Sequence, residues 1–170
     1  AVDSTYLAGE PLGTLVFGST WNEMNETFNI TARNDLHGKS NINLHAALTP
    51  RTSILEAKAM IDGLDVTYAQ PFLSDIFSEM NGQIYGEIDA RGPINDLSIS
   101  STDTRLEDGE ITIAMTNVPY KAQGTFHLND RGVFFDDITI SDRFEGTGKV
   151  TGSINYDHFR NLRFDTGIIA

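Results

Sequence analysis

The chain has 170 residues, no cysteine, and 24 acidic against 12 basic side chains, which gives a formal net charge of −12. A protein that binds nucleic acid needs a basic surface, so this balance argues against a nucleic-acid partner. The lack of cysteine excludes disulfides and thiolate chemistry. No segment approaches the run of about 20 apolar residues that a membrane-spanning helix requires.

The first half of the chain carries a period of two in its apolar residues. Residues 1–11 are mixed and polar, which indicates an irregular or edge segment. From Gly13 onward, apolar residues occupy alternate positions, most clearly in 27–32, 40–48 and 54–66. This period is typical of a strand with one face toward water and one face away from it.

One segment departs from the period of two. Its apolar residues follow i, i+4 spacing, and they are Phe72, Leu73, Ile76, Phe77 and Met80. This spacing predicts a short amphipathic helix over about 71–80, with Pro71 in its first turn and Asn81-Gly82 at its end. We expect the apolar stripe of this helix to cap one end or one face of the sheet.

The stretch 109–156 is the longest run of alternating residues. Turn residues at 128–132 and 141–146 divide it into short segments, as in a β-meander. Four glycines lie within these and neighbouring strands on the apolar side: Gly86, Gly124, Gly148 and Gly152. Glycine at such a position often marks a bend, or a place where another group approaches the backbone closely. The sheet is therefore expected to curl over its apolar face.

The predicted fold is all-β. It is an elongated antiparallel meander curled into an open, taco-like groove, with one short amphipathic helix. The alternative is a closed β-sandwich in which the same apolar residues form an ordinary filled core. The chain stops in the middle of an apparent strand pattern, so we interpret residues 1–170 as a single β-rich fragment of a larger protein.

Candidate catalytic and metal-binding residues are sparse. The four histidines have no partner at a recognised ligand spacing, and His45 and His127 are expected on the polar side of their strands. The carboxylates of Asp136, Asp137 and Asp142 do not follow a calcium-loop pattern, so turn and cap roles are expected. No catalytic or nucleotide-binding motif occurs. We therefore expect no enzymatic activity, no metal and no cofactor.

The order of segments over 71–165 resembles the C-terminal region of TamB-like proteins, a branch of the AsmA-like family, in its Bacteroidota form. Each motif alone is weak, and their order carries the resemblance. The motifs are FLSDIFSEM at 72–80, NGQIYGEI at 81–88, GPINDL at 92–97, LEDGEI at 106–111, NVPY at 117–120, FFDDITISD at 134–142, GTGKVTGSI at 146–154 and YDHF at 156–159. Residues 143–145 lengthen one link relative to the family pattern.

The resemblance implies a translocation and assembly module protein of the cell envelope, located in the periplasm of a Gram-negative bacterium. Its inner-membrane anchor would lie outside this fragment, and its partner would be an outer-membrane barrel of the Omp85 type. The implied role is non-enzymatic: phospholipid transport between the membranes, outer-membrane protein assembly and secretion, or both. The alternative function is a carbohydrate-binding or adhesin-like β-sandwich module.

An apolar groove would shelter phospholipid acyl chains without specific side-chain chemistry. A strand of about 8 residues spans about 27 Å, which is long enough for this purpose. The residues expected to line the groove are Ile84, Ile88, Ile111, Ile113, Met115, Phe126, Leu128, Phe135, Ile138, Ile140, Val150 and Ile154.

Overall fold

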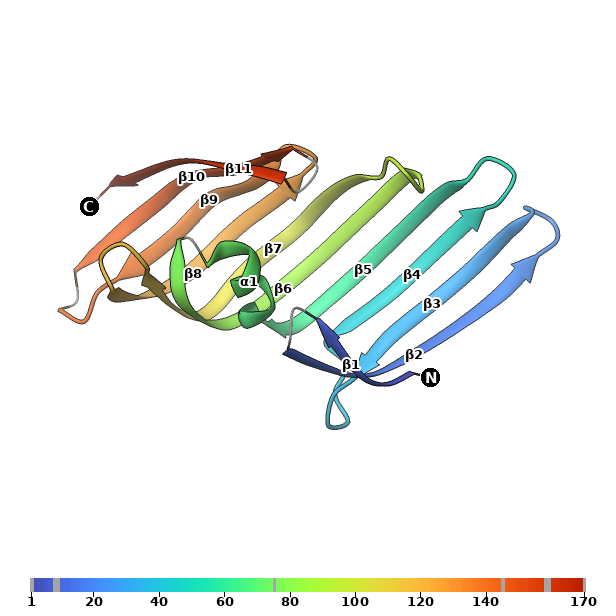
Figure 1. The fold of residues 1–170 in the computed structure, drawn as a ribbon, viewed down its shortest axis with the longest axis horizontal. Coiled ribbons are helices and arrows are strands. Elements are labelled where there is room, and N and C mark those ends of the chain that lie inside the picture. Colours follow the sequence, from blue (N-terminus) through green and yellow to red (C-terminus); the bar gives the residue numbers. More distant parts are fainter. Residues whose placement is uncertain (1, 8–9, 75, 145, 158–159, 170) are drawn as a thin grey trace. The chain divides into compact units, whose positions relative to one another are not determined.

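A computed structural model describes the backbone of residues 2–7, 10–74, 76–144, 146–157 and 160–169. Within these ranges, the side chains of residues 5–6, 11–71, 73–74, 76–144 and 146–155 are described. The chain is all-β, as the alternating pattern predicts. Its strands form one open, unclosed antiparallel sheet in which the order in the sheet follows the order in the sequence (Figure 1).

The elements run in chain order with short connections. They are β1 (Val2–Leu7), β2 (Glu10–Asn22), β3 (Thr27–Asp35), β4 (Ile42–Thr49), β5 (Ile54–Asp65), a 3₁₀ turn η1 (Val66–Ala69), α1 (Gln70–Leu73), β6 (Phe77–Pro93), β7 (Ser98–Ile113), β8 (Val118–Asn129), β9 (Gly132–Ser141), β10 (Thr147–Asp157) and β11 (Arg160–Ile169).

The strand order confirms the meander and shows that the alternative of a closed sandwich is wrong. A sandwich needs a second sheet packed face to face on the first, whereas the described strands belong to one unclosed sheet. The segment 1–11 contributes an edge strand, β1, rather than an irregular segment.

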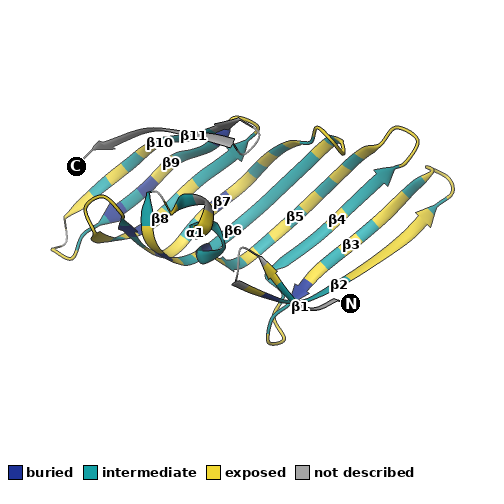
Figure 2. Cartoon of the chain, in the orientation of Figure 1, coloured by how far each residue is buried: buried dark blue, intermediate teal, exposed yellow. Residues whose placement is uncertain are grey.

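The chain divides into two compact units. The first comprises Ala1–Asp62 and Gly86–Thr102, and the second comprises Gly63–Tyr85 and Asp103–Ala170. Buried apolar side chains are unevenly distributed between them (Figure 2). Among the described side chains, Leu12 is the buried apolar residue of the first unit, whereas the second unit buries a cluster of Ala122, Ile138 and Ile140.

The predicted helix over 71–80 is wrong in its extent. A 3₁₀ turn and α1 cover 66–73, and Pro71 lies in the first turn of α1 as expected. Phe77 and Met80 instead belong to β6, as do Asn81 and Gly82. The spacing of four residues between Ile76, Met80 and Ile84 is also a multiple of two, so it fits a strand as well as a helix.

Backbone pairing with β7 resolves this ambiguity in favour of the strand. The Ala114 amide donates to the Ile76 carbonyl at 2.8 Å. The Ser78 hydroxyl donates to the Thr112 carbonyl at 3.4 Å. β6 lies beside β7 in the sheet, where its backbone groups can pair, while Asn81 and Gly82 are poor helix formers. Tertiary pairing therefore overrides the local helical signal.

Three of the four in-strand glycines adopt a positive φ, at 139° for Gly86, 145° for Gly124 and 147° for Gly152. Gly124 precedes a register shift between β8 and β9, and Gly152 lies at a shift between β9 and β10. Both shifts leave an extra residue on β9 between Phe135 and Ile138, so the bulge lies in β9 and the two glycines lie on the strands beside it. Gly148 lies in an unshifted part of the register, opposite Ile140.

Replacement of Gly124 by alanine is expected to destabilise the second unit. A Cβ at this position would overlap the carbonyl oxygen of Asp137, and the φ of 145° would be strained for any other residue. We expect Gly124→Ala to lower the free energy of unfolding by about 2–5 kcal/mol, measured by urea denaturation with circular dichroism.

Gly63→Ala is the matched control in the same unit. Gly63 also has a positive φ, of 70°, but its Cβ would meet flexible side-chain ends at 3.4 Å. Backbone strain alone should cost about 1–2 kcal/mol. Equal losses in the two variants would show that close packing against β9 is unimportant at Gly124.

Candidate functional site

The first unit has one continuous apolar face. Directly opposed residues on antiparallel strands point to the same side of a sheet, and the register aligns Phe28 with Leu48 and Leu48 with Leu55. We call this surface the apolar face of the first unit. Its members on β2–β5 are Leu15, Phe17, Trp21, Phe28, Ile30, Ala32, Ile42, Leu44, Ala46, Leu48, Leu55, Ala57, Ala59 and Ile61.

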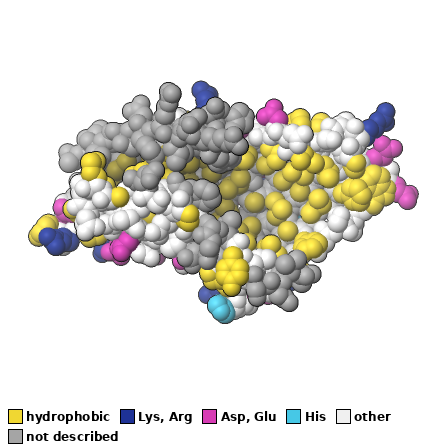
Figure 3. Space-filling model, viewed as in Figure 1, with side chains coloured by type: hydrophobic (Ala, Val, Ile, Leu, Met, Phe, Trp, Pro, Cys, Tyr) yellow, Lys and Arg dark blue, Asp and Glu magenta, His cyan; other side chains and the backbone are white. Residues whose placement is uncertain are grey.

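None of these side chains is buried. Most are half-buried by their neighbours within the sheet, and three aromatic residues at the β2 side are exposed: Phe17 to 59 %, Trp21 to 47 % and Phe28 to 39 %. The rings of Trp21 and Phe28 contact each other at 4.8 Å with a 59° tilt. Figure 3 shows the apolar side chains gathered on this surface. Such a contiguous patch is typical of a binding surface.

Asn34 fixes one end of this face. Its side chain is 1 % exposed and points to the same side as Leu15, its partner on β2. The side-chain nitrogen Nδ2 of Asn34 donates to the Leu12 carbonyl at 3.2 Å. The side-chain oxygen Oδ1 accepts from the backbone amides of Asn41 and Ile42 at 2.9 and 2.8 Å. One side chain thus ties β2 to the start of β4 through three hydrogen bonds.

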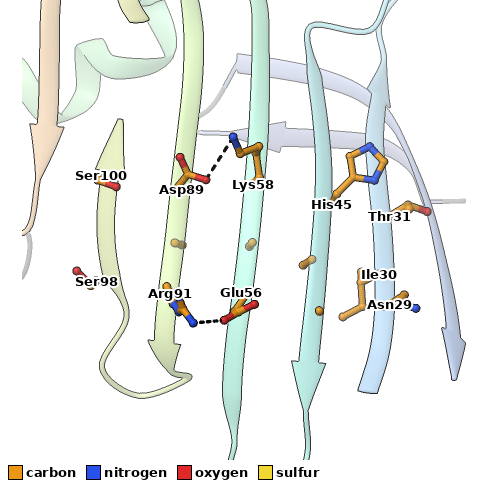
Figure 4. Close-up of a pocket in the computed structure, with 14 residues that line it drawn as sticks. Asn29, Ile30, Thr31, His45, Glu56, Lys58, Asp89, Arg91, Ser98 and Ser100 are labelled. Carbon is orange, nitrogen blue, oxygen red and sulfur yellow. Dashed lines mark ion pairs between the residues drawn. The ribbon is translucent and has the colours of Figure 1, made fainter. Parts of the chain in front are cut away.

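The opposite face of the first unit is polar and hollowed (Figure 4). It forms an open depression of about 850 Å³ across β3–β7. The polar side chains that line it are Asn29, Thr31, His45, Glu56, Lys58, Asp89, Arg91, Ser98 and Ser100. The alternation of the strands therefore separates apolar from charged chemistry within this unit.

Ion pairs between β5 and β6 neutralise most of the charge in this depression. Lys58 Nζ lies 2.7 Å from Glu87 Oε2 and 3.7 Å from Asp89 Oδ1, and Arg91 Nη2 lies 2.7 Å from Glu56 Oε1. These pairs join the two strands, and as exposed pairs they contribute little to stability.

The hydrogen bond to Glu87, followed by the charges of Asp89 and Glu87, raises the pKa of Lys58 above its usual 10.5. The folded chain therefore holds this proton more tightly than the unfolded chain. The associated stabilisation is complete below the ordinary lysine pKa and is lost only as the pH rises through the raised value. These ion pairs are thus constant at neutral pH.

The second unit has its own apolar face, and here the centre is buried. Ala122, Ile138 and Ile140 form a cluster with exposures of 2–8 %, against which Leu106, Ile111, Tyr120, Phe135 and Val150 pack. Thr104 is 2 % exposed beside this cluster, and its hydroxyl donates to the Phe126 carbonyl. This part of the sheet is a small filled core.

Most residues predicted to line a groove fall on this face of the second unit. Ile111, Phe135, Ile138, Ile140 and Val150 are brought together in the cluster. Phe126 opposes Phe135, Ile154 opposes Val133 as Leu128 does, and Ile113 opposes Val118. Ile138, Ile140 and Ile154 are buried, so their side chains pack within the protein instead of lining an open surface.

The prediction is wrong for Met115. β7 ends at Ile113, and Met115 lies in the following turn with 91 % of its surface exposed. Ile84 and Ile88 are both half-buried on β6. Ile84 belongs to the second unit and Ile88 to the first, so the predicted set spans both units.

The residues predicted to form a helical cap do not act as one helix. Leu73 ends α1, Ile76 lies in a turn, and Phe77 and Met80 lie in β6. Met80 is buried, with 5 % of its surface exposed. Val66 of η1 is buried as well, with 4 % exposed, and its burial was not predicted. The side chain of Phe72 lies outside the described residues.

The apolar face of the first unit is the main feature that the sequence analysis missed. Its strands show the same alternation as 109–156, and this signal was used to predict the strands but not a surface. Asn34 was also missed, since an asparagine in a polar link carries no sequence signal for burial.

The predicted positions of His45 and His127 and the turn role of Asp142 are confirmed, whereas the turn role predicted for Asp136 and Asp137 is wrong. His45 and His127 lie on polar faces, and His127 Nδ1 lies 2.7 Å from Asp136 Oδ2. Asp142 caps a turn by accepting from the Phe144 and Gly146 amides at 2.8 and 2.9 Å. Asp136 and Asp137 form ion pairs on β9 and do not lie in a turn.

Among the described residues, no group of three or more histidine, aspartate or glutamate side chains is arranged to hold a metal ion. No helix within the described part of the chain has the length and hydropathy to cross a membrane.

Comparison with known proteins gives no match. No protein-family model, no curated protein and no solved structure is significantly similar to the chain.

Removal of the Asn34 side chain should weaken the first unit. Asn34→Ala leaves the Asn41 and Ile42 amides and the Leu12 carbonyl without this partner, and we expect a loss of about 1–3 kcal/mol in the free energy of unfolding. Asn29→Ala on the exposed side of β3 should change it by less than about 0.5 kcal/mol. Urea denaturation of both variants measures the difference, and equal midpoints would contradict the role of Asn34.

Proposed function

We propose that this chain is part of a non-enzymatic periplasmic scaffold that shelters phospholipid acyl chains on the apolar side of its sheet. The scaffold would serve phospholipid transport between the inner and outer membranes, outer-membrane protein assembly, or both. The observation that carries the proposal is the apolar face of the first unit, which remains unburied across β2–β5.

The dimensions of this face suit an acyl chain. β4 has 8 residues, so it spans about 27 Å, whereas one leaflet of a bilayer has a hydrocarbon thickness of about 15 Å. Each methylene group removed from water contributes about 0.8 kcal/mol. A chain laid across Ala46, Ala57 and their neighbours would therefore bind through burial alone.

The small side chains at the centre of the face support the same reading. Ala32, Ala46, Ala57 and Ala59 lie among larger leucine and isoleucine residues. The small and large side chains together form an uneven apolar surface whose side chains carry no hydrogen-bonding groups. Such a surface suits an acyl chain, which has none either. The resemblance of 71–165 to TamB-like proteins supports the periplasmic setting and an Omp85-type partner, and both remain part of the proposal.

The partner in an assembly role would be a nascent barrel strand. Such a strand alternates apolar and polar residues, so its lipid-facing side would contact the same apolar face. Lipid and barrel strands are therefore two cargoes for one surface, and the experiment that tests the proposal must identify what is bound.

Photo-crosslinking at adjacent residues on opposite faces tests the proposal. Ala46 faces the apolar side of β4 and Ala47 the polar side, and both are half-buried. In the second unit, Phe135 and Phe134 form a similar pair on β9. A photoreactive phenylalanine at residue 46 or 135, in cells that produce the parent protein, is expected to capture phospholipid or an identified outer-membrane barrel protein.

The same probe at residue 47 or 134 is the control and should capture neither. Mass spectrometry of the crosslinked products identifies the cargo. Equal labelling from both faces would refute the proposal. It would also be refuted if neither residue 46 nor residue 135 captured lipid or barrel protein in folded protein. Capture at residue 46 alone would restrict the binding surface to the first unit.

A further inference from the structure

Three turns of the first unit lie together at one end of its strands. The connections β2–β3, β4–β5 and β6–β7 share this end because successive strands are antiparallel (Figure 1). The Ile94 amide donates to the Ser53 carbonyl at 3.0 Å, so the second and third turns are joined. Neighbouring turns are two strand spacings apart, or about 10 Å. We call this end the turn rim, and it comprises residues 21–28, 49–54 and 93–98.

Exposed apolar side chains concentrate at the turn rim. Among the described side chains of the first unit, the large apolar residues that are exposed at the rim are Trp21, Met24, Phe28, Ile54 and Ile94, and those exposed elsewhere are Tyr6, Phe17 and Met60. Turns are normally built from polar residues and glycine, whereas Met24 lies in a turn with 93 % of its surface exposed. Single exposed apolar residues are ordinary, but a cluster of them marks an interaction site.

The opposite end of the same strands is polar. The β3–β4 connection exposes His37, Gly38 and Lys39, and its apolar residue, Leu36, is half-buried. The backbones of Leu36 and Lys39 pair with each other, and Asp35 Oδ1 accepts from the Gly38 amide at 2.9 Å. Strand alternation separates the two faces of a sheet but not its two ends. The apolar character of the turn rim therefore has another cause.

The rim is apolar on both sides of the sheet. Phe28 lies on the apolar face of the first unit, whereas Ile54 lies on the other side, since its neighbour Leu55 belongs to the apolar face. Met24 and Ile94 lie in the turns, beyond the strand ends. A partner that packs on one face of the sheet would leave part of this set uncovered. A surface that meets the strands end-on covers all of it.

We propose that the turn rim docks end-on at the surface of a lipid bilayer. Met24 and Ile94 enter the outer part of the acyl layer, and Trp21 lies at the level of the headgroups. Tryptophan favours this level because its ring is apolar and its Nε1–H is polar. Trp21 lies beside the first turn, and its ring centroid is 4.8 Å from that of Phe28. Apolar side chains of interfacial proteins enter a bilayer by about 5–10 Å, which suits side chains in turns.

The charges of the rim select the kind of bilayer. Its turns expose three acidic side chains, Glu23, Glu26 and Asp96, and one basic side chain, Arg51. The chain as a whole carries −12. Anionic lipids attract basic segments and would repel this surface. The bilayer that fits is therefore zwitterionic, with phosphatidylcholine or phosphatidylethanolamine headgroups.

The rim is continuous with the apolar face of the first unit through Trp21 and Phe28. Docking places the end of that face at the bilayer surface, where an acyl chain would enter it. Docking itself needs only the rim, so it does not depend on acyl-chain binding across β2–β5. Vesicle binding reports on the rim, whereas the crosslinks from residue 46 report on the face, so failure of one proposal is distinguishable from failure of the other.

Flotation of the full chain with phosphatidylcholine vesicles tests the proposal. We expect a binding constant on the order of 10⁴ M⁻¹, as for a single myristoyl chain. Vesicles that also contain phosphatidylglycerol should bind the chain less tightly at low salt than at high salt, because salt screens the repulsion.

Met24→Glu should lower the binding constant for phosphatidylcholine vesicles about tenfold or more, because a charge replaces an apolar side chain that the bilayer buries. Met60→Glu is the matched control. Met60 is also an exposed methionine of the first unit, but it lies opposite Asn43, near the other end of β4. This variant should bind as the unchanged chain does. Circular dichroism of both variants verifies that they are folded.

Site-specific probes test the end-on orientation. Trp21 is the single tryptophan of the chain, and its emission should shift to shorter wavelength on vesicles. The chain has no cysteine, so Met24→Cys and Lys39→Cys each carry one environment-sensitive dye. The dye at residue 24 should respond to vesicles, and the dye at residue 39, in the opposite turn, should not.

Three results would overturn the proposal. Absence of flotation of the folded chain at about 1 mM phosphatidylcholine would show that the rim does not bind a bilayer, since a constant of that order would leave most of the chain bound. Equal loss of binding in Met24→Glu and Met60→Glu would show that the rim has no special role. Equal responses of the dyes at residues 24 and 39 would show that the unit lies flat on the bilayer.

Discussion

The hydrogen-bond ladder between sequential strands is the interaction on which the rest of this protein depends. The strand order follows the chain order, so each strand is held chiefly by its two neighbours, as in repetitive elongated folds. The first unit has little buried apolar surface to add to this, because Leu12 is its buried apolar residue among the described side chains. Polar ties such as Asn34 therefore carry more weight there than in a filled core.

The ladder also separates the chemistry of the two sides. Because side chains alternate along a strand, one face of the first unit collects aliphatic residues and the other collects Lys58, Arg91 and their carboxylate partners. The apolar side, where we propose that acyl chains bind, needs no precise geometry for such contact, whereas the ion pairs join β5 to β6 on the polar side.

Sequence reasoning predicted the features that depend on period alone. The strands and the meander follow from alternation, and the positive φ of Gly124 and Gly152, beside the bulge in β9, follows from glycine chemistry. The helix extent failed at Met80 because a spacing of four suits both helix and strand, and pairing with β7 decides between them. The prediction that Met115 lines the groove failed because the alternating pattern continues past the end of β7. No local signal in the sequence marks where the strand pairing stops. The burial of Asn34 depends on partners 7, 8 and 22 residues away, which the local sequence does not identify.

The contrast between the two units follows from where the larger apolar residues meet. In the second unit, Ala122 lies opposite Ile140, and Ile138 lies opposite Val150 and Gly124, so the bulge lets neighbouring strands close over a small core. In the first unit, pairing through β2–β5 continues without a shift, from Asn22–Thr27 to Ile42–Ile61. A regular ladder keeps its apolar side chains in flat rows that cannot bury one another.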